Sequence, residues 1–300
     1  MSHHPIKRRV LVGGATGKQG NAVATLLLEH GHEVVAYVRS TQSPQALALE
    51  AGGAKLAVGD LADRDALAQA ALDVDVMFGI TFPFGKDGAR EEIAQGQALA
   101  DVAAAQRKYL IYSSIAGGQR RPSDLGVEHA SSKQTIEAYM ATQELALTII
   151  APVYLMENLL NFNFTGLTHE TYAQPLSPQR KIDQVTVLDI AGMAVYALEH
   201  PEELVGKRVE VASERINGIE IAQTLSEVIG RPIRYVQVPI EQISKMAGKE
   251  IAKMYQSFED DPYYIDIAAL HAQYPGVKWH TFRQWVETLD WKKLLPRSCY

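Results

Sequence analysis

Cysteine is almost absent from this 300-residue sequence, whose one example is Cys299. A single cysteine excludes an intramolecular disulfide and any zinc site built from several thiolates. The nine histidines show no spacing typical of a metal-binding helix, so no metal site is predicted. His30 and His32 flank Gly31, and we expect both to face solvent in a turn.

Long apolar runs and an excess of positive charge are also missing. No run of residues is apolar enough to span a bilayer, and the residues before Val10 lack the apolar core of a signal peptide. The formal net charge is −6, and no basic stripe is interleaved with aromatic residues, which argues against nucleic-acid binding. We therefore expect a soluble, cytoplasmic protein with neither a membrane nor a nucleic acid as its partner.

A glycine motif near the start of the sequence is the strongest signal that is present. An apolar run, Val10 to Val12, leads into glycines spaced three residues apart, and an amphipathic helix is predicted to follow. Small residues let the backbone approach a pyrophosphate, and the first N–H groups of a helix bind anions. The alternative is a glycine turn without a ligand, but a strand predicted at residues 34–38 supplies the context that the motif needs. The predicted phosphate-binding residues are Gly14, Ala15, Thr16, Gly17, Lys18, Gln19 and Gly20.

Short β-rich runs alternate with helical segments over the first half of the chain. Strands are predicted at residues 10–12, 34–38, 55–58, 74–79, 109–113 and 147–151. Helices are predicted at residues 20–30, 44–51, 64–71, 89–106 and 131–144. This alternation is typical of an α/β protein with a Rossmann-type, doubly wound parallel sheet. In such a sheet the ligand lies over the carboxyl ends of the strands, and the loops there are the candidate site.

The strict alternation stops after Pro152. A helix at residues 188–200 and a strand at residues 207–212 are expected to return to the main sheet. We therefore predict a dinucleotide-binding Rossmann domain over residues 1–152, to which part of residues 185–235 returns. Residues 153–184 and 236–300 are predicted to form a smaller, irregular α+β lobe at the C-terminal side for the substrate.

The end of the second predicted strand lacks the acidic residue that binds the adenosine ribose in NAD-specific Rossmann proteins. Arg39 and Ser40 stand there instead. Arg39 can stack on adenine and pair with a 2′-phosphate, which a carboxylate would repel, and Lys18 adds a second positive charge. The residues thus favour NADP(H) over NAD(H) as cofactor. The alternative for Arg39 is a solvated surface arginine.

Further candidates follow the third, fourth and fifth predicted strands. The Asp60 carboxylate is placed to accept a hydrogen bond from the adenine amino group while Leu61 covers the ring; alternatively, Asp60 is the N-cap of the next helix. Thr81, Phe82 and Pro83 follow the fourth strand, where the backbone of such folds passes the ribose and pyrophosphate. Ser113 ends the fifth strand, where it can touch nicotinamide or substrate, or satisfy loop backbone groups.

Five segments together resemble the NmrA-like branch of the atypical short-chain dehydrogenase/reductases. They are Val12–Gly20, Val38–Thr41, Gly59–Leu61, His129–Lys133 and Val153–Leu160. The resemblance is looser beyond residue 160. It implies an NADP(H)-preferring Rossmann core, a small C-terminal substrate lobe, and Tyr154 and Asn158 close to the nicotinamide. The family contains quinone and phenylpropanoid reductases, and also members that bind the dinucleotide as redox sensors or transcriptional co-regulators.

The wider superfamily catalyses with a Tyr-x-x-x-Lys pair on one helical face. Here the expected helix keeps Lys133 but carries His129 in place of the tyrosine. A second candidate pair, Tyr274 and Lys278, encloses Pro-Gly and is interpreted as a turn. Two interpretations stay open: Lys133 binds the nicotinamide ribose and His129 supplies a proton to the acceptor, or His129 has no chemical role.

These residues predict an NADPH-dependent oxidoreductase that passes hydride to a small apolar acceptor, aromatic or quinone-like. Five aromatic residues are candidates to line its pocket, or to pack the lobe: Phe82, Phe84, Phe162, Tyr263 and Tyr264. The alternative function is a non-catalytic NADPH/NADP⁺ redox sensor. Such a sensor would act through a protein partner or through a change of homo-oligomeric state.

Overall fold

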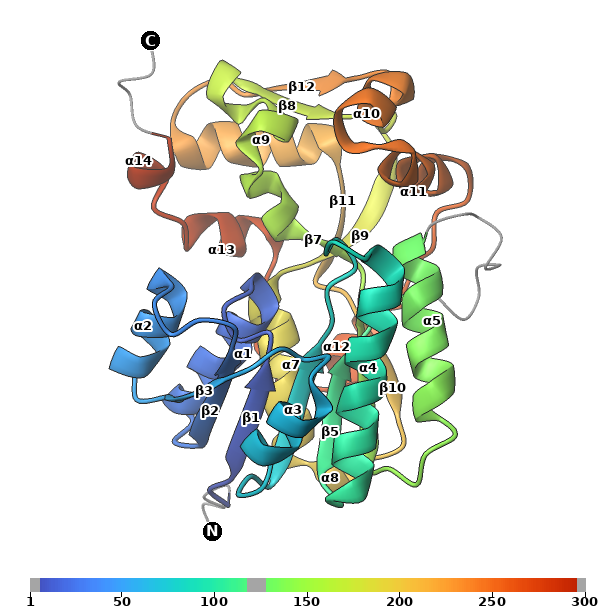
Figure 1. The fold of residues 1–300 in the computed structure, drawn as a ribbon. Coiled ribbons are helices and arrows are strands. Elements are labelled where there is room, and N and C mark those ends of the chain that lie inside the picture. Colours follow the sequence, from blue (N-terminus) through green and yellow to red (C-terminus); the bar gives the residue numbers. More distant parts are fainter. Residues whose placement is uncertain (1–5, 118–127, 296–300) are drawn as a thin grey trace. The chain divides into compact units, whose positions relative to one another are not determined.

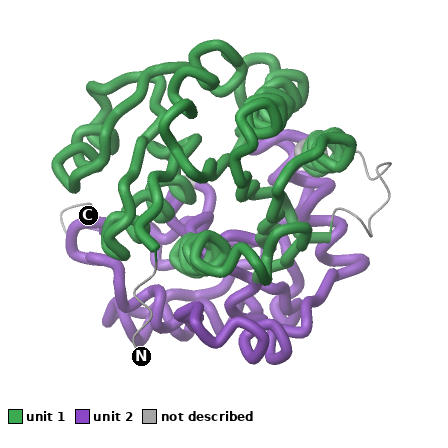
Figure 2. The backbone as a smooth tube through the Cα atoms, turned by 90° about the horizontal axis from the view of Figure 1, so that it is seen from below, with its two compact units in different colours: residues 1–120, 128–152, 187–211 green, residues 121–127, 153–186, 212–300 purple. Residues whose placement is uncertain are grey.

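The computed structural model describes residues 6–117 and 128–295, except for the side chains of residues 128, 129 and 163. The chain forms two compact units (Figure 2). Unit 1 consists of the described residues up to 117 together with residues 128–152 and 187–211. Unit 2 consists of residues 153–186 and the described residues from 212 onward.

Unit 1 is organised by a seven-stranded parallel sheet in the order β10-β6-β5-β4-β1-β2-β3 (Figure 1). The strands are β1 (Arg9–Gly13), β2 (Glu33–Val38), β3 (Lys55–Val58), β4 (Val76–Ile80), β5 (Tyr109–Ser113), β6 (Leu147–Pro152) and β10 (Arg208–Val211). From β1 the chain proceeds outward to β3, then crosses to β4 and proceeds to the other edge. This order confirms the predicted doubly wound, Rossmann-type sheet, and β10 is the predicted returning strand.

Helices cover both faces of this sheet. The helices are α1 (Lys18–Glu29), α2 (Pro44–Ala51), α3 (Arg64–Ala70), α4 (Gly88–Ala105), α5 (Glu128–Met140), α7 (Val187–Glu199) and the short α8 (Pro201–Leu204). Helix α1 packs against α7 and α2, whereas α4 packs against α3 and α5 (Figure 1). Strand β1 is therefore enclosed, and its residues Val10 to Gly13 are all buried. Among the described helices, none combines the length and the apolar character needed to cross a bilayer.

Unit 2 contains two small sheets and short helices. Its strands pair in the orders β11-β9-β7 and β12-β8. The strands are β7 (Tyr154–Leu155), β8 (Thr171–Gln174), β9 (Lys181–Val185), β11 (Glu214–Asn217) and β12 (Arg234–Gln237). The helical elements are η2 (Met156–Leu160), α6 (Phe162–Thr165), η3 (Leu167–His169), α9 (Gly218–Ile229), α10 (Ile240–Ala247), α11 (Lys249–Asp260), α12 (Ile267–Gln273), α13 (Phe282–Glu287) and α14 (Trp291–Leu294). This mixture confirms the predicted smaller α+β part.

The prediction that His30 and His32 both face solvent is wrong for His32. Its ring is buried because Gly31, at φ 81°, turns the chain back toward the sheet directly after α1. The His32 Nδ1 atom accepts the backbone N–H of Arg8 at 3.2 Å, and Nε2 lies 3.4 Å from Glu199 Oε1. The histidine thus joins the loop before β2 to the end of α7.

Candidate functional site

The loops of the candidate site follow five adjacent parallel strands of unit 1. The pairs Gly13 with Tyr37, Val38 with Val58, and Ile80 with Ser113 fix the register near the strand ends. Because the strands are parallel, their carboxyl ends meet at one edge of the sheet. The glycine loop after β1 lies between the loops after β2 and β3 on one side and those after β4 and β5 on the other.

The glycine loop has the backbone geometry of a phosphate-binding turn. Gly14 has φ 68°, a left-handed conformation that favours glycine, and the Gly17 N–H donates to its carbonyl at 2.9 Å. A Cβ atom at position 20 would overlap that same carbonyl oxygen. Helix α1 begins with Gly17 as its N-cap and has no side-chain cap, whereas Ser43 caps α2. No capping side chain takes up the first N–H groups of α1, which is how helix starts bind phosphate.

Exposed polar side chains follow β2. The side chains of Arg39 and Ser40 are exposed, and so is that of Lys18 in the glycine loop. Within the described part of the chain, Arg39 makes no hydrogen bond or ion pair. The Ser40 Oγ atom accepts the backbone N–H of Gln42 at 3.2 Å. Arg39 therefore presents a positive charge that no described residue pairs with.

Asp60 shapes the loop after β3. Its Oδ1 atom accepts the backbone N–H of Ala62 at 2.9 Å, and its carbonyl accepts the Tyr37 hydroxyl at 3.1 Å. The alternative assignment of Asp60 as a helix N-cap is wrong, because Asp63 directly precedes α3 and caps it through Ala66 N at 3.1 Å. The half-buried Leu61 side chain packs close to Gly13, at the end of β1.

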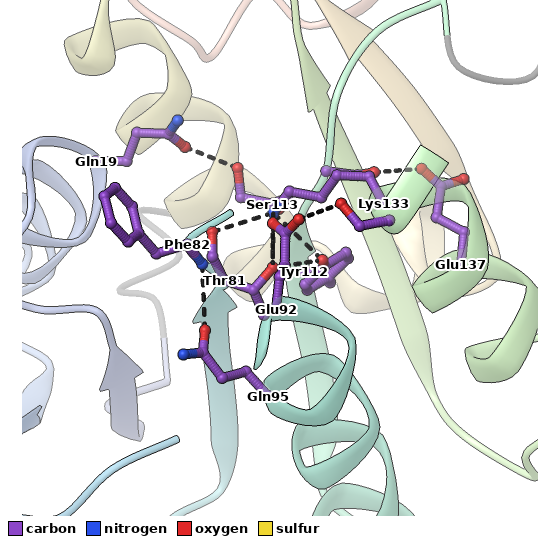
Figure 3. A network of polar contacts seen from close by, with 11 residues as sticks. Gln19, Thr81, Phe82, Glu92, Gln95, Tyr112, Ser113, Lys133 and Glu137 are labelled. Atoms are coloured by element: carbon purple, nitrogen blue, oxygen red, sulfur yellow. Dashed lines mark hydrogen bonds and ion pairs between the residues drawn. The ribbon is translucent and has the colours of Figure 1, made fainter. Parts of the chain in front are cut away.

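A buried ammonium lies at the ends of β4 and β5 (Figure 3). Lys133 on α5 is 7% exposed, and its Nζ atom donates to Thr81 Oγ1 at 2.8 Å and to the Ser113 carbonyl at 3.2 Å. The Thr81 carbonyl and the Tyr112 hydroxyl each lie at 3.3 Å, and Glu92 Oε1 at 3.2 Å. The lysine is thus fixed by both strands and by α4.

Burial controls the ionisation of this cluster. Burial lowers the pKa of the Lys133 ammonium below its usual value, while the charge and hydrogen bond of Glu92 oppose that shift. Burial also raises the pKa of the Tyr112 phenol well above its usual value. Tyr112 is therefore uncharged at neutral pH. The charges that decide the electrostatics are those of Lys133 and the carboxylates near it.

Two hydrogen bonds anchor the surrounding loops. Ser113 Oγ donates to Gln19 Oε1 at 2.7 Å, which ties the end of β5 to the first turn of α1. The Phe82 backbone N–H donates to Gln95 Oε1 of α4 at 3.2 Å. The Phe82 and Phe84 rings are each 57% exposed and meet edge to face, with centroids 5.7 Å apart. With the half-buried Pro83 between them, they form an anchored loop with two exposed aromatic rings.

Three other sequence candidates lie in unit 2 or have side chains outside the described residues. Tyr154 and Asn158 belong to unit 2, where the Tyr154 hydroxyl lies 2.8 Å from that of Tyr255. Their proximity to a nicotinamide stays a prediction. His129 lies in the first turn of α5, but its side chain is outside the described residues, so its role stays a prediction too.

The Tyr274 and Lys278 pair is a turn, as predicted. Tyr274 ends α12, and the Val277 N–H donates to its carbonyl at 3.1 Å. The two residues therefore share no helical face and offer no Tyr-x-x-x-Lys pair.

Comparison with known proteins identifies the family. The NmrA-like family model matches residues 6–287. The chain belongs to the NmrA-like family. It is 29% identical over 235 residues to the NAD(P)H azoreductase of Xenophilus azovorans, covering 78% of each chain.

Two solved structures have a similar fold. The negative transcriptional regulator NmrA, in complex with NADP, gives a TM-score of 0.76 at 19% identity, over 94% of this chain and 95% of that one. The NADPH-dependent quinone oxidoreductase QOR2 of Escherichia coli, complexed with NADPH, gives 0.75 at 19% identity, over 93% and 99%. At these identities the likeness establishes the fold alone.

The sequence analysis of this NmrA-like protein missed three residues around the buried lysine. They are Glu92 on α4, Tyr112 on β5 and Ser132 on α5, whose hydroxyl donates to Glu92 Oε2. A signal for Glu92 was present, because it occupies the same helical stripe as Gly96 and Leu99, which face the core. A carboxylate in an apolar stripe indicates a buried partner.

Proposed function

We propose that this NmrA-like protein is an NADP(H)-dependent oxidoreductase whose coenzyme lies along the carboxyl ends of β1 to β5. The observation that carries this proposal is the Lys133 ammonium, buried where β4 and β5 end, next to the strand that leads into the glycine loop. A charged donor fixed at that place suits the ribose next to a nicotinamide. The coenzymes named with NmrA and QOR2 support NADP(H).

The residues of unit 1 fit a phosphorylated dinucleotide. The uncapped start of α1 and the close packing of Gly20 on Gly14 leave the backbone, not side chains, to meet a pyrophosphate. Arg39 is exposed and holds the 2′-phosphate. On the same side Ser40, Asp60 and Leu61 take the adenosine, with Lys18 adding positive charge.

The other side of the loop takes the nicotinamide half. Thr81 to Pro83 supply the backbone that lines it, Ser113 and Lys133 hold its ribose, and His129 relays a proton where one is needed. The bound coenzyme supplies a hydride. The residues of unit 2, within 153–184 and 236–300, form the substrate lobe, to which Tyr154 and Asn158 belong.

The acceptor is a small, flat, apolar molecule, aromatic or quinone-like. The exposed rings of Phe82 and Phe84 offer it an aromatic surface. An acceptor whose reduced form is stabilised by conjugation needs little acid catalysis, so a histidine in place of the superfamily tyrosine is compatible with turnover. The azoreductase and the quinone oxidoreductase among its relatives support this class of substrate.

Steady-state NADPH oxidation tests this proposal. A panel of quinones and azo dyes is added to protein whose NADPH binding has first been measured by fluorescence. We expect turnover with at least one class of flat acceptor. The absence of any turnover above the buffer rate, with NADPH demonstrably bound, would rule out the reductase.

A second function is favoured by a different observation. Lys133 makes its hydrogen bonds to protein groups, and position 129 is a histidine, not a tyrosine. These features suit a site that binds the coenzyme but provides no strong acid catalysis. NmrA itself is described as a negative transcriptional regulator. A redox sensor of this kind binds NADPH without turnover. It would show a change of sedimentation, or of bound protein partner, when NADPH replaces NADP⁺.

A further inference from the structure

Glu92 is a fully buried carboxylate with both oxygens in use (Figure 3). Its Oε1 atom accepts the Thr81 hydroxyl at 2.9 Å and lies 3.2 Å from Lys133 Nζ. Its Oε2 atom accepts the hydroxyl of Ser132, the residue before that lysine. Burial of a carboxylate is unfavourable unless it is paired and hydrogen-bonded. Glu92 meets both conditions through three neighbours of the candidate site.

Other charged or titratable groups near Lys133 act on its charge less strongly than Glu92 does. Glu137, one turn further along α5, accepts hydrogen bonds from Ser114 and, at 2.9 Å, from the guanidinium of Arg208. Arg208 pairs with Glu210 as well, at 2.8 Å, and the charge of Glu137 raises the pKa of Lys133 less than Glu92 does. The Tyr112 phenol contributes no charge, because burial raises its pKa well above the usual value. Among the described residues, Glu92 is the carboxylate within ion-pair distance of Lys133.

We propose that Glu92 is a positioning residue that holds the Lys133 ammonium at the ends of β4 and β5 and keeps it charged for coenzyme binding. This inference rests on the coenzyme site of the proposed function. Glu92 is fully buried, so it acts through Lys133 and not by touching the coenzyme. The effect of Glu92 on the pKa of Lys133 has a definite direction. Burial lowers the pKa of Lys133, Glu92 opposes that shift, and loss of Glu92 lowers the pKa further.

Coenzyme binding as a function of pH tests the proposal in the full-length protein. The dissociation constant for NADPH is measured by fluorescence for wild type, Glu92→Gln and Lys133→Met. We expect little change for wild type between about pH 6 and pH 9, and roughly tenfold weaker binding at the upper end for Glu92→Gln, as Lys133 loses its proton. Lys133→Met is expected to bind weakly at every pH, because it has no proton to lose.

The matched control is Glu137→Gln. It removes a buried carboxylate whose charge also acts on Lys133 but leaves the Glu92 ion pair in place, so its pH profile should shift less than that of Glu92→Gln. Glu92→Asp keeps the charge in a shorter side chain. It is expected to give a profile between those of wild type and Glu92→Gln. A structural defect alone would weaken binding equally at all pH values.

A second measurement needs no coenzyme. In protein labelled with ¹³C at the lysine ε-carbons, the signal missing from Lys133→Met reports the ionisation of Lys133. We expect this ammonium to stay protonated across the range in wild type, to titrate within it in Glu92→Gln, and to titrate at an intermediate pH in Glu92→Asp. Should Glu92→Gln not fold, wild type and Glu92→Asp still decide the matter.

The outcomes separate this inference from the proposed function. A flat binding profile and an unshifted lysine titration in Glu92→Gln would overturn the role of Glu92, as would a neutral Lys133 in wild type. Failure of wild-type protein to bind NADPH would instead overturn the coenzyme site. In that case the labelled lysine still shows whether Glu92 keeps Lys133 charged.

Discussion

The two sides of the glycine loop are built in different ways. After β2 and β3, Arg39 and Ser40 are exposed, and the Ser40 and Asp60 side chains accept hydrogen bonds from backbone groups only two residues away. After β4 and β5, the polar side chains are buried and bonded to one another across elements far apart in the chain; Lys133 and Thr81, for example, are 52 positions apart. One side presents an exposed arginine, whereas the other holds its lysine in a buried network.

This difference between the two sides should separate mutational effects on coenzyme binding from effects on stability. A substitution on the exposed side removes ligand contacts and leaves the fold as it was, because surface changes away from special features usually alter stability little. A substitution on the buried side disturbs the lysine cluster and the packing around it together. The two sides should therefore respond to mutation in distinguishable ways.

Charge reversal on the exposed side should have the largest effect. Arg39→Asp is expected to weaken NADPH binding by at least about 100-fold, since a charge-assisted pair is replaced by repulsion. NADH affinity should be retained or rise, because an acidic side chain at this position can accept hydrogen bonds from the adenosine ribose, and the unfolding midpoint should stay at the wild-type value. Fluorescence titration with both coenzymes measures this. Lys55→Asp, at the far end of β3, is the control for general electrostatics. Unchanged NADPH affinity, or wild-type NADH binding as tight as NADPH binding, would refute the assignment.

A methyl group added at position 20 should reduce both the stability of the protein and its affinity for NADPH. Gly20→Ala forces the first turn of α1 away from Gly14, and we expect a destabilisation of about 1–3 kcal/mol with a loss of NADPH affinity of about tenfold or more. Urea denaturation and titration measure the two effects. Gly31→Ala is the matched control. It strains a left-handed residue at φ 81° far from the loop, so it should reduce stability without reducing affinity.

Removing the exposed rings should affect the acceptor alone. Phe82→Ala combined with Phe84→Ala is expected to raise the KM for a flat acceptor by about five- to tenfold, the range expected of aromatic contacts. The NADPH dissociation constant should not change, because both rings are largely exposed. Steady-state kinetics with a quinone measures KM. Leu47→Ala removes an exposed apolar side chain from α2 and serves as the control. An equal rise of KM in that control would contradict a specific role.

The smallest effect should come from the bond that joins the two sides. Ser113→Ala and Gln19→Ala each remove the 2.7 Å hydrogen bond, and each is expected to lower the free energy of unfolding by about 0.5–1.5 kcal/mol. The double variant should lose less than the sum of the two, because the bond can be lost only once. Strict additivity in urea denaturation would show that the bond contributes nothing.

Most of unit 1 could be predicted from local patterns. Its strands are short apolar runs bounded by turn residues, as expected where both faces are covered. Helix α2 was predicted at its observed bounds, because Ser43 and Pro44 form a clear helix start. Strand β4 begins two residues later than predicted. Val74 and Asp75 belong to the preceding loop, where the Asp75 carboxylate accepts the Arg9 N–H at 2.8 Å.

Unit 2 was predicted less completely than unit 1, for physical reasons. Strands β8 and β9 have only a few residues each and bury polar side chains such as Gln174 and Asp183, so they lack an apolar alternation. Helix α9 did carry a sequence signal. Asn217 and Glu220 form a capping box directly before an apolar stripe. Helix α11 is amphipathic, and the tertiary contacts of Tyr255 complete it.

In the candidate site, too, some features could be predicted from the sequence and others could not. The glycine loop and Arg39 each follow a predicted strand, so both could be identified from the sequence. The sequence did not show that Thr81, Glu92 and Tyr112 meet at Lys133, because they come from separate elements and only the fold brings them to one ammonium. Sequence reasoning therefore found the lysine but not the groups that control its charge.

Strand β10 joins the sheet only after the chain has passed through residues 153–186 of unit 2. As the protein leaves the ribosome, β6 is consequently an unpaired edge and α1 lacks its neighbour α7 until residues 187–211 have been synthesised. A gene fragment that stops at residue 152 would encode a sheet with an open, aggregation-prone border. In the nascent chain this edge stays unpaired while residues 153–186 of unit 2 are synthesised. Neither unit is therefore encoded by one uninterrupted stretch of the gene.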